Sequence, residues 1–426
     1  MKNLKLLIVV LFVFVSLLTK LYFINSINTK GMYQKEFVYK NGDASHYIII
    51  AENIKNNWSY SDNNNKITES ATWRPPFWPL LLSIYMFFTS SFFGIAIVKI
   101  VFESFLLVTF LYCFKKNEHQ NFLFFLLSLL ILFEPQYLKY STTFLSESIT
   151  AILILLLGIV FYLSIKNDKP NIFISLLSNV AILSHPASIF FIFLLIFFYF
   201  IYFSKKKFRK VFTHIILFFI LLSMWPLRNH LVFNQGAFIT TSQGATFSKG
   251  WNDNVLNDFN NVDGDLADES LNLKYLNNPD IVNKEFIQMS KIYRDATIHF
   301  FKNQDYITIF KIAFKKVKSN FNPFPEKNKK GMLENLGVIF RVLYLLLFFQ
   351  SIYLIFNNKF KVKNIIFPII VVFIYSGQVF LSILIYSGIR FNSIYGLILF
   401  FCLLIVNFEL LNRITKKIVK LCSLTP

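Results

Sequence analysis

Residues 149–165 read ITAILILLLGIVFYLSI, an apolar run without a charged side chain. About 17 to 25 such residues in a helix cross the ~30 Å hydrocarbon core of a bilayer. Similar runs recur from one end of the 426-residue chain to the other. The sequence is 55% hydrophobic and only 15% charged, whereas a soluble protein of this length needs a more charged exterior. The composition excludes an ordinary soluble enzyme and predicts an all-α polytopic membrane protein.

We predict ten membrane-spanning helices from these runs. Lys2 and Lys5 precede the first run, and because no small-residue cleavage site follows it, we interpret it as a retained helix and not as a signal peptide. The other nine are expected at about 93–114, 121–133, 149–165, 172–184, 187–203, 211–226, 336–356, 364–386 and 391–410. Two of them, 121–133 and 172–184, are short for a complete crossing. The alternative is therefore that these two helices do not cross and the number of spanning helices is lower by two.

The positions of Lys and Arg predict how the chain lies in the membrane. Short cytoplasmic loops collect these residues, whereas loops on the other side do not. If residues 77–91 form a juxtamembrane helix and do not cross, every basic cluster falls on one side. The clusters are Lys2/Lys5, Lys115/Lys116, Lys166/Lys169, residues 205–210, Lys359/Lys361/Lys363 and Arg413/Lys416/Lys417/Lys420. Both termini are then expected in the cytoplasm, and the net charge of +20 indicates orientation in a lipid bilayer, not a nucleic-acid partner.

This topology divides the chain into three parts. Residues 1–226 are expected to form a transmembrane module with two external loops, 25–92 and 134–148. Residues 227–333 form a hydrophilic, mainly helical external insert. Residues 334–426 contain the last transmembrane helices and a basic cytoplasmic tail.

One segment of the insert, 306–321, has the pattern of a basic amphipathic helix. Its apolar residues, among them Phe310 and Phe314, alternate with Lys311 and Lys315. Such a helix usually lies on a membrane surface or packs on a neighbouring domain. We favour the membrane surface, and a simple solvated helix is the alternative.

Several ionisable residues lie beside predicted helix ends on the external side. Asp43 starts a helical stretch and Glu147 precedes the run 149–165, so each can be an ordinary helix-start acid. Arg74 can contact lipid phosphates, and His185 can stabilise a turn. An ionisable side chain at membrane depth is nevertheless costly, which makes each of them a functional candidate.

The topology brings two carboxylates and four cations to one external rim. These residues are Asp43, Glu147, Arg74, Lys139, Arg228 and Arg390. Fixed and partly desolvated cations stabilise the negative charge that grows on a phosphate leaving group. A neighbouring carboxylate can take the proton of an attacking hydroxyl. The combination predicts chemistry on a phosphate-linked substrate.

Several motifs on this rim resemble a known family. Residues 42–51 read GDASHYIIIA, and residues 74–82 read RPPFWPLLL. Both are similar to the first external loop of GT-C glycosyltransferases, in particular the bacterial family 39-like proteins related to protein O-mannosyltransferases and the lipid A aminoarabinose transferase. Ser146-Glu147 in the second loop and WPLRN at 225–229 are further matches. The resemblance covers roughly residues 1–250, and the remainder matches in layout only.

The resemblance implies an enzyme that transfers a sugar from a polyprenyl-phosphate donor to a lipid, glycan or protein acceptor of the cell envelope. It also implies a multi-pass protein of the bacterial inner membrane with its active site facing the exterior. Asp43 would be the catalytic carboxylate, and Arg74 would contact the donor phosphate. Glu147 stands where relatives often carry Asp, so it can assist catalysis, contact the sugar or, together with Asp43, hold a divalent cation such as Mg or Mn.

The same rim supplies candidates for the rest of the site. Lys139, Arg228 and Arg390 are expected near the donor phosphate. The candidates for substrate binding are His46, Tyr47, His185 and Asn229.

Three other functions would leave different features in the sequence. A lipid flippase is expected to have inverted repeats and ionisable residues near the middle of the membrane. An O-antigen polymerase or ligase would use Arg or His residues of late loops in place of an early Asp. A membrane scaffold without activity would have no use for Asp43.

Overall fold

The computed structural model describes residues 2–31, 33–40, 42–63, 67–118, 128–234, 238–258, 262, 267–276, 284–324, 332–357, 362, 365–386 and 388–407. Within these ranges every regular element is a helix, which confirms the predicted all-α class for them. Six helices are long and apolar enough to cross a membrane, so the chain is a helical multi-pass membrane protein. They are α1 (Lys2–Thr29), α5 (Phe92–Glu118), α8 (Glu147–Lys166), α10 (Ile189–Phe233), α15 (Met332–Asn357) and α16 (Ile366–Leu384).

The helix α10 is a hairpin of two helices. Its backbone leaves the helical region at Lys207, where φ is −141° and ψ is 37°. The ring centroids of Phe193 and Phe218 are 5.9 Å apart. In a straight helix these two residues would be separated by about 37 Å. The chain therefore folds back at Lys207, between the two runs that the sequence separates at 187–203 and 211–226.

Shorter helices complete the bundle. They are α2 (Lys35–Val38), α3 (Gly42–Asn57), α4 (Phe77–Tyr85), α7 (Pro135–Ser141), α9 (Phe173–Ser184), α17 (Ile389–Ser393) and the single turns η1 (Ser70–Trp73), η2 (Leu130–Phe133) and η3 (Pro186–Ser188). The nine residues of α4 extend only about 14 Å, which is too short to cross and agrees with a juxtamembrane position for 77–91. The twelve residues of α9 also fall short of 30 Å.

Ten spanning helices remain a prediction. Most of the expected span 121–133 lies outside the described residues, as do residues 408–410 of the last one. The last expected span, 391–410, begins with the short helix α17, and a second apolar helix follows at Gly396–Asn407.

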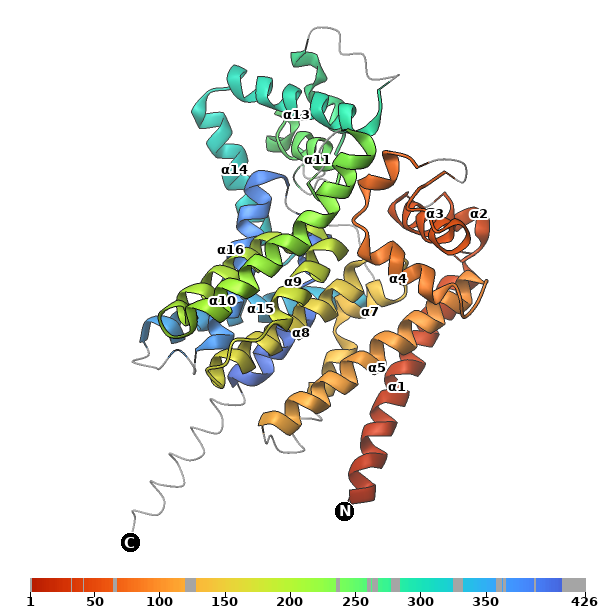
Figure 1. Cartoon of the computed structure of the whole chain (residues 1–426), viewed down its shortest axis with the longest axis vertical. Helices are drawn as coiled ribbons and strands as arrows, with labels where there is room; N and C mark the ends of the chain where they lie inside the picture. The colour runs from red at the N-terminus through yellow and green to blue at the C-terminus, as the bar shows by residue number, and fades with distance from the viewer. Residues whose placement is uncertain are drawn as a thin grey trace.

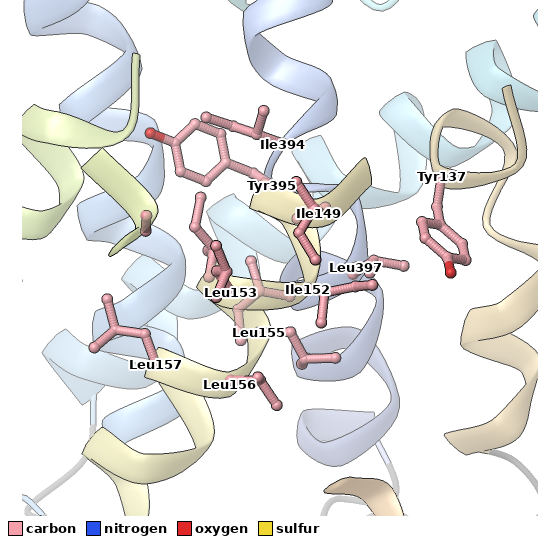
Figure 2. Close-up of a cluster of buried hydrophobic side chains, with 14 of the residues drawn as sticks. Tyr137, Ile149, Ile152, Leu153, Leu155, Leu156, Leu157, Ile394, Tyr395 and Leu397 are labelled. Carbon is pink, nitrogen blue, oxygen red and sulfur yellow. The ribbon is translucent and has the colours of Figure 1, made fainter. Parts of the chain in front are cut away.

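Buried side chains of α8 form the centre of the bundle. Nearly every residue of this helix is buried, as its uninterrupted apolar sequence predicts. Figure 2 shows Ile149, Ile152 and Leu155 of α8 close to Ile394 and Leu397. Gly158 allows this approach, because a Cβ atom there would lie 2.6 Å from Cδ1 of Ile398. The residues after α17 therefore pack directly on α8.

The residues of the expected insert pack on one end of the bundle (Figure 1). Their helices are α11 (Gln243–Gly250), η4 (Asp253–Leu256), η5 (Glu269–Tyr275), α13 (Phe286–Asn303) and α14 (Tyr306–Asn320). They share a small core of their own around Trp251, Val255, Phe300 and Ile312. In Figure 1 the N-terminal end of α1 lies at the opposite end of the molecule.

Two close contacts join this insert to α16. Gly250 lies so near the end of α16 that a Cβ atom would overlap the carbonyl oxygen of Ile385. The buried ammonium of Lys316 donates to the carbonyl oxygens of Gly250 and Ile383, both at 3.2 Å, and to that of Ile385 at 2.8 Å. A cation is favourable at the C-terminal end of a helix. Lys316 therefore links α14, α11 and α16.

Candidate active site

Asp43 lies in the first turn of α3, where the sequence allows a simple helix-start acid. Gly42 before it has φ of +40°, a left-handed conformation that a side chain would strain. Both oxygens of the Asp43 carboxylate are bound by arginine. Arg74 Nη2 donates to Oδ1, and Arg390 Nη1 donates to Oδ2 at 2.6 Å. The carboxylate is therefore the meeting point of two cations that are far apart in sequence.

Arg74 is positioned by the two prolines that follow it. The residue before a proline is restricted to extended conformations, and Arg74 has φ of −107° and ψ of 142°. Its carbonyl accepts a hydrogen bond from the hydroxyl of Tyr60 at 2.9 Å. Its Nε is buried and has no hydrogen-bond partner among the described residues. The Nε–H of Arg74 is thus available to a further hydrogen-bond acceptor.

The helical period of α3 decides which of its polar residues join the site. Asp43 and Tyr47 are four residues apart and share a face. Tyr47 is buried, with its ring centroid 5.2 Å from Cζ of Arg74. His46 lies about 100° around the helix, and its Nε2 is 3.0 Å from Oδ2 of Asp62. Of these two substrate-binding candidates, only Tyr47 belongs to the cluster.

Arg390 connects the two carboxylates. It lies in α17, which follows Gly388, and its Nε donates to Oε1 of Glu147 while its Nη1 donates to Asp43. Glu147 is the first residue of α8 and is buried. Its Oε2 has no hydrogen-bond partner among the described residues. One guanidinium group thus holds together two carboxylates, one at the start of α3 and one at the start of α8.

His185 contacts the same carboxylate from the end of α9. Its Nδ1 accepts from the backbone N–H of Ala187 at 3.3 Å, which is the turn-stabilising bond expected from the sequence. The proton of the neutral imidazole is then on Nε2, which lies 3.9 Å from Oε1 of Glu147. His185 lies between α9 and α10, and burial lowers its pKa to about 4. The ring is therefore neutral near pH 7.

The two arginines decide the charge state of Asp43. Burial by itself would raise the pKa of the Asp43 carboxyl. The charges and hydrogen bonds of Arg74 and Arg390 outweigh this effect and hold the pKa well below its usual range. Asp43 is thus ionised at neutral pH, and it is a weak proton acceptor as long as both arginines bind it.

A cavity of about 760 Å³ opens beside this cluster. Asp43, Tyr47, Arg74, His185 and Arg390 line one part of it. The other part is formed by the insert and by the end of α16, through residues such as Gln243, Thr246, Arg294, Leu384 and Tyr386. This volume is within the range of small-molecule sites, which combine apolar walls with a few polar groups. A smaller cavity of about 190 Å³ is also bordered by Asp43 and Arg390.

Four of the expected site residues lie elsewhere. Lys139 is an exposed residue of α7, with its Nζ 5.7 Å from the ring centroid of Tyr140. Arg228 stacks on the rings of Trp225 and Phe233, and its Nη1 donates to Oδ1 of Asn229 at 3.0 Å. Lys139, Arg228, Asn229 and His46 do not line the cavity described above. Favourable contact between a cation and aromatic rings accounts for the position of Arg228 against Trp225 and Phe233.

A buried network supports the start of α8. The ammonium of Lys99 donates to Ser148 Oγ at 2.8 Å and lies 3.4 Å from Oε1 of Glu103. Ser148 in turn donates to Glu103 at 2.8 Å. Because Ser148 follows Glu147, this network helps to fix the position of the Glu147 carboxylate.

The carboxylates do not form a metal site as they stand. Arg390 fills the space between Asp43 and Glu147 with a positive charge. The described residues contain no group of three or more His, Cys, Asp or Glu side chains that could hold an ion. Mg and Mn prefer about six oxygen ligands, so the donor set found here does not fit either ion.

Comparisons of the chain with known protein families, with curated proteins and with solved structures find no match.

Proposed function

We propose that the chain is a membrane glycosyltransferase of the GT-C type. It would transfer a sugar from a polyprenyl-phosphate donor to a hydroxyl group of a lipid, glycan or protein acceptor on the external face of the cell membrane. The observation that carries the proposal is the Asp43 carboxylate, held between Arg74 and Arg390 at the wall of a large cavity. The motif around Asp43 and the motif around Arg74 both resemble the first external loop of the family, and the two side chains are in contact.

The arginines suit the phosphate of the donor. Arg74 has a buried Nε without a partner among the described residues, and Arg390 forms part of the same cavity wall. Arginine binds phosphate with paired, charge-assisted hydrogen bonds. In the reaction, the bond between the anomeric carbon and the phosphate oxygen breaks, and its electron pair stays on that oxygen. Two fixed guanidinium groups stabilise the charge that grows there.

Asp43 would act on the acceptor. The acceptor oxygen forms the new bond to the anomeric carbon, and its proton passes to the Asp43 carboxylate. Phosphate binding would draw the positive charge of Arg74 and Arg390 away from Asp43. Because these charges depress the pKa of Asp43, their loss raises its basicity when the donor is present.

Glu147 and His185 would be positioning residues. Glu147 binds Nε of Arg390 and so leaves the Nη side of that guanidinium directed at Asp43. His185 approaches Glu147 with its Nε2 and keeps its Nδ1 on the backbone. The resulting chain of contacts orients Arg390.

One alternative retains support. An O-antigen polymerase or ligase was expected to use Arg or His of late loops, and Arg390 is a late-loop arginine at the centre of the cluster. The two functions differ in the donor, which carries one phosphate in a GT-C enzyme of this type and two in the polymerase or ligase. Membranes supplied separately with sugar-monophosphate and glycan-diphosphate polyprenols distinguish them by which donor is consumed.

The test of the proposal is Asp43→Asn, assayed in membranes with a panel of radiolabelled polyprenyl-phosphate sugars. We expect loss of transfer by at least about a hundredfold, because a general base contributes roughly 10²–10⁴ in rate. Glu52→Gln is the matched control, since Glu52 lies on the same helix and contacts Tyr39 outside the cavity. Transfer by Asp43→Asn at the wild-type rate would refute the mechanism.

The orientation of the chain in the membrane is tested separately. A reporter fused near Asn117, at the end of α5, is expected to report the cytoplasm. An external signal there would show that the candidate site faces the wrong side of the membrane.

A further inference from the structure

A second polar cavity lies on the opposite side of α17 from the candidate active site. It has a volume of about 50 Å³, and its lining includes Gln136, Asn322, Arg341, Tyr344, Gln378 and Asn392. Asn392 and Arg390 are two residues apart on α17, or about 200° around the helix. Arg390 therefore faces the Asp43 cluster, whereas Asn392 faces this second cavity.

Among the residues that the structure describes, Arg341 is the only charged one that lines this cavity. It makes no ion pair and no hydrogen bond with any described residue, and its Nε is buried without a partner. Glu134 lies nearby but is occupied by other groups. Its Oε2 accepts from the N–H of Tyr137 at 2.6 Å, and its Oε1 from the hydroxyl of Tyr344 at 3.3 Å. A partly buried guanidinium without a counterion is costly, so an anion is the missing partner.

Gln378 gives independent support for a ligand. It lies on α16, and only 4% of the residue is exposed. Its backbone carbonyl accepts from Ser382 Oγ at 2.8 Å and from Asn320 Nδ2 at 3.4 Å, whereas its side-chain amide makes no hydrogen bond to a described residue. The amide atoms are not among the buried polar atoms without a partner, so they remain accessible to a ligand. The amide borders the same cavity as Arg341 and can donate to the same anion.

The cavity lies near one end of the bundle, where the insert packs. Arg341 is about 13 Å along α15 from Met332, and Gln378 is about 9 Å from the end of α16 at Leu384. Asn320, Phe321 and Pro323, at the end of α14, also line it. Figure 1 shows α14 beside the end of α16. Relative to the predicted spans 336–356 and 364–386, Arg341 lies about 8 Å and Gln378 about 12 Å inside the end on which the insert packs.

We propose that this cavity binds the phosphate group of a membrane lipid. Arg341 supplies the charge, and the amides of Gln378 and Asn392 supply neutral donors. A volume of about 50 Å³ admits a group of a few atoms, such as one phosphate. The lipid is either an anionic phospholipid or polyprenyl phosphate, because both present the same oxygens. The site does not depend on the glycosyltransferase proposal, since none of its lining residues belongs to the Asp43 cluster.

The test measures lipid binding to the full-length purified protein by native mass spectrometry. Phosphatidylglycerol, polyprenyl phosphate and uncharged diacylglycerol are titrated in turn. Polyprenyl phosphate is titrated in the Arg74→Gln background, so that binding at the candidate active site does not contribute. We expect at least one phosphate lipid to bind about tenfold more tightly than diacylglycerol. Arg341→Gln should remove this preference.

Two further variants keep the result interpretable. Gln378→Leu, which is close in volume, should weaken binding of the same lipid without a change of charge, even if Arg341→Gln does not fold. Lys302→Gln, an exposed residue of α13, should leave binding unchanged. The proposal is overturned if the wild-type protein shows no preference for phosphate lipids, or if the preference survives in both Arg341→Gln and Gln378→Leu. Whichever of phosphatidylglycerol and polyprenyl phosphate binds more tightly shows which class of lipid the cavity takes.

Discussion

Arg390 Nη1 lies 2.6 Å from Oδ2 of Asp43, although 347 positions of sequence separate the two residues. The contact joins the start of α3 to α17. Because Arg390 also binds Glu147, three separate parts of the chain must be in place before the cluster exists. The candidate site is therefore a property of the folded bundle, and its first loop alone cannot form it.

Arg390→Lys tests the geometry of this contact. An ammonium cannot bind Glu147 and Asp43 in the directions that a planar guanidinium uses. Losing one charge-assisted hydrogen bond costs about 1.5–3 kcal/mol, so we expect transfer to fall by about ten- to a hundredfold. Arg228→Lys is the control, because Arg228 lies outside the cavity. Equal losses in the two variants would argue against a special role for Arg390.

The lowered pKa of His185 predicts a dependence of stability on pH. The folded chain has a His185 pKa of about 4, whereas the ordinary value is about 6.5. Between these values the unfolded chain binds more protons, so stability falls as the pH drops from about 6.5 to about 4. The slope from one group is at most about 1.4 kcal/mol per pH unit. Thermal unfolding in detergent should show a shallower slope for His185→Gln than for wild type; identical slopes would contradict the assignment.

Gly250→Ala tests the attachment of the insert to α16. The new methyl group would overlap the carbonyl oxygen of Ile385, so one of the two segments must move. We expect a loss of about 1–3 kcal/mol in stability, measured as a lower Tm. Lys249→Ala, at the neighbouring residue on α11, removes a partly buried ion pair to Glu269 at 3.3 Å without adding a group at the contact, so it should change the Tm less. A Tm of Gly250→Ala equal to that of Lys249→Ala would mean that this contact is not tight in solution.

The exposed face of α14 predicts contact with lipid. Tyr306, Ile307, Phe310 and Phe314 are mostly exposed on this helix, and the same face carries Lys311. Aromatic and basic residues together favour a membrane surface. A fluorophore on Phe310→Cys should be quenched by spin-labelled lipid in vesicles, more strongly than one on Lys302→Cys of α13. The same quenching at both positions would favour the solvated alternative.

The helical period explains what the sequence could predict about the site. Asp43 and Tyr47 fall on one face of α3 by their spacing, and Glu147 falls at the start of an apolar run that must be buried. The hairpin in α10 follows from two apolar runs separated by a basic cluster. These predictions depend only on local patterns, and local patterns are visible in the sequence.

Other parts of the site depend on tertiary packing. The sequence alone does not reveal that Arg228 packs against the rings of Trp225 and Phe233 and does not line the large cavity. It also does not reveal that Gln243 and Arg294 of the insert form a wall of the cavity. Arg341 and Gln378 appear in the sequence as isolated polar residues in apolar helices. Only the fold shows that they border one cavity.

Lys316 connects the insert, which forms one part of the large cavity, to the chain that leads into Arg390 on the charged part. It binds the carbonyl oxygens of Gly250 in the insert and of Ile385 at the end of α16, a few residues before Arg390. A displacement of the insert at Gly250 would therefore be transmitted through Lys316 to Ile385, five residues before Arg390. In the proposed mechanism, entry of the acceptor and the contact of Arg390 with Asp43 would thus be coupled.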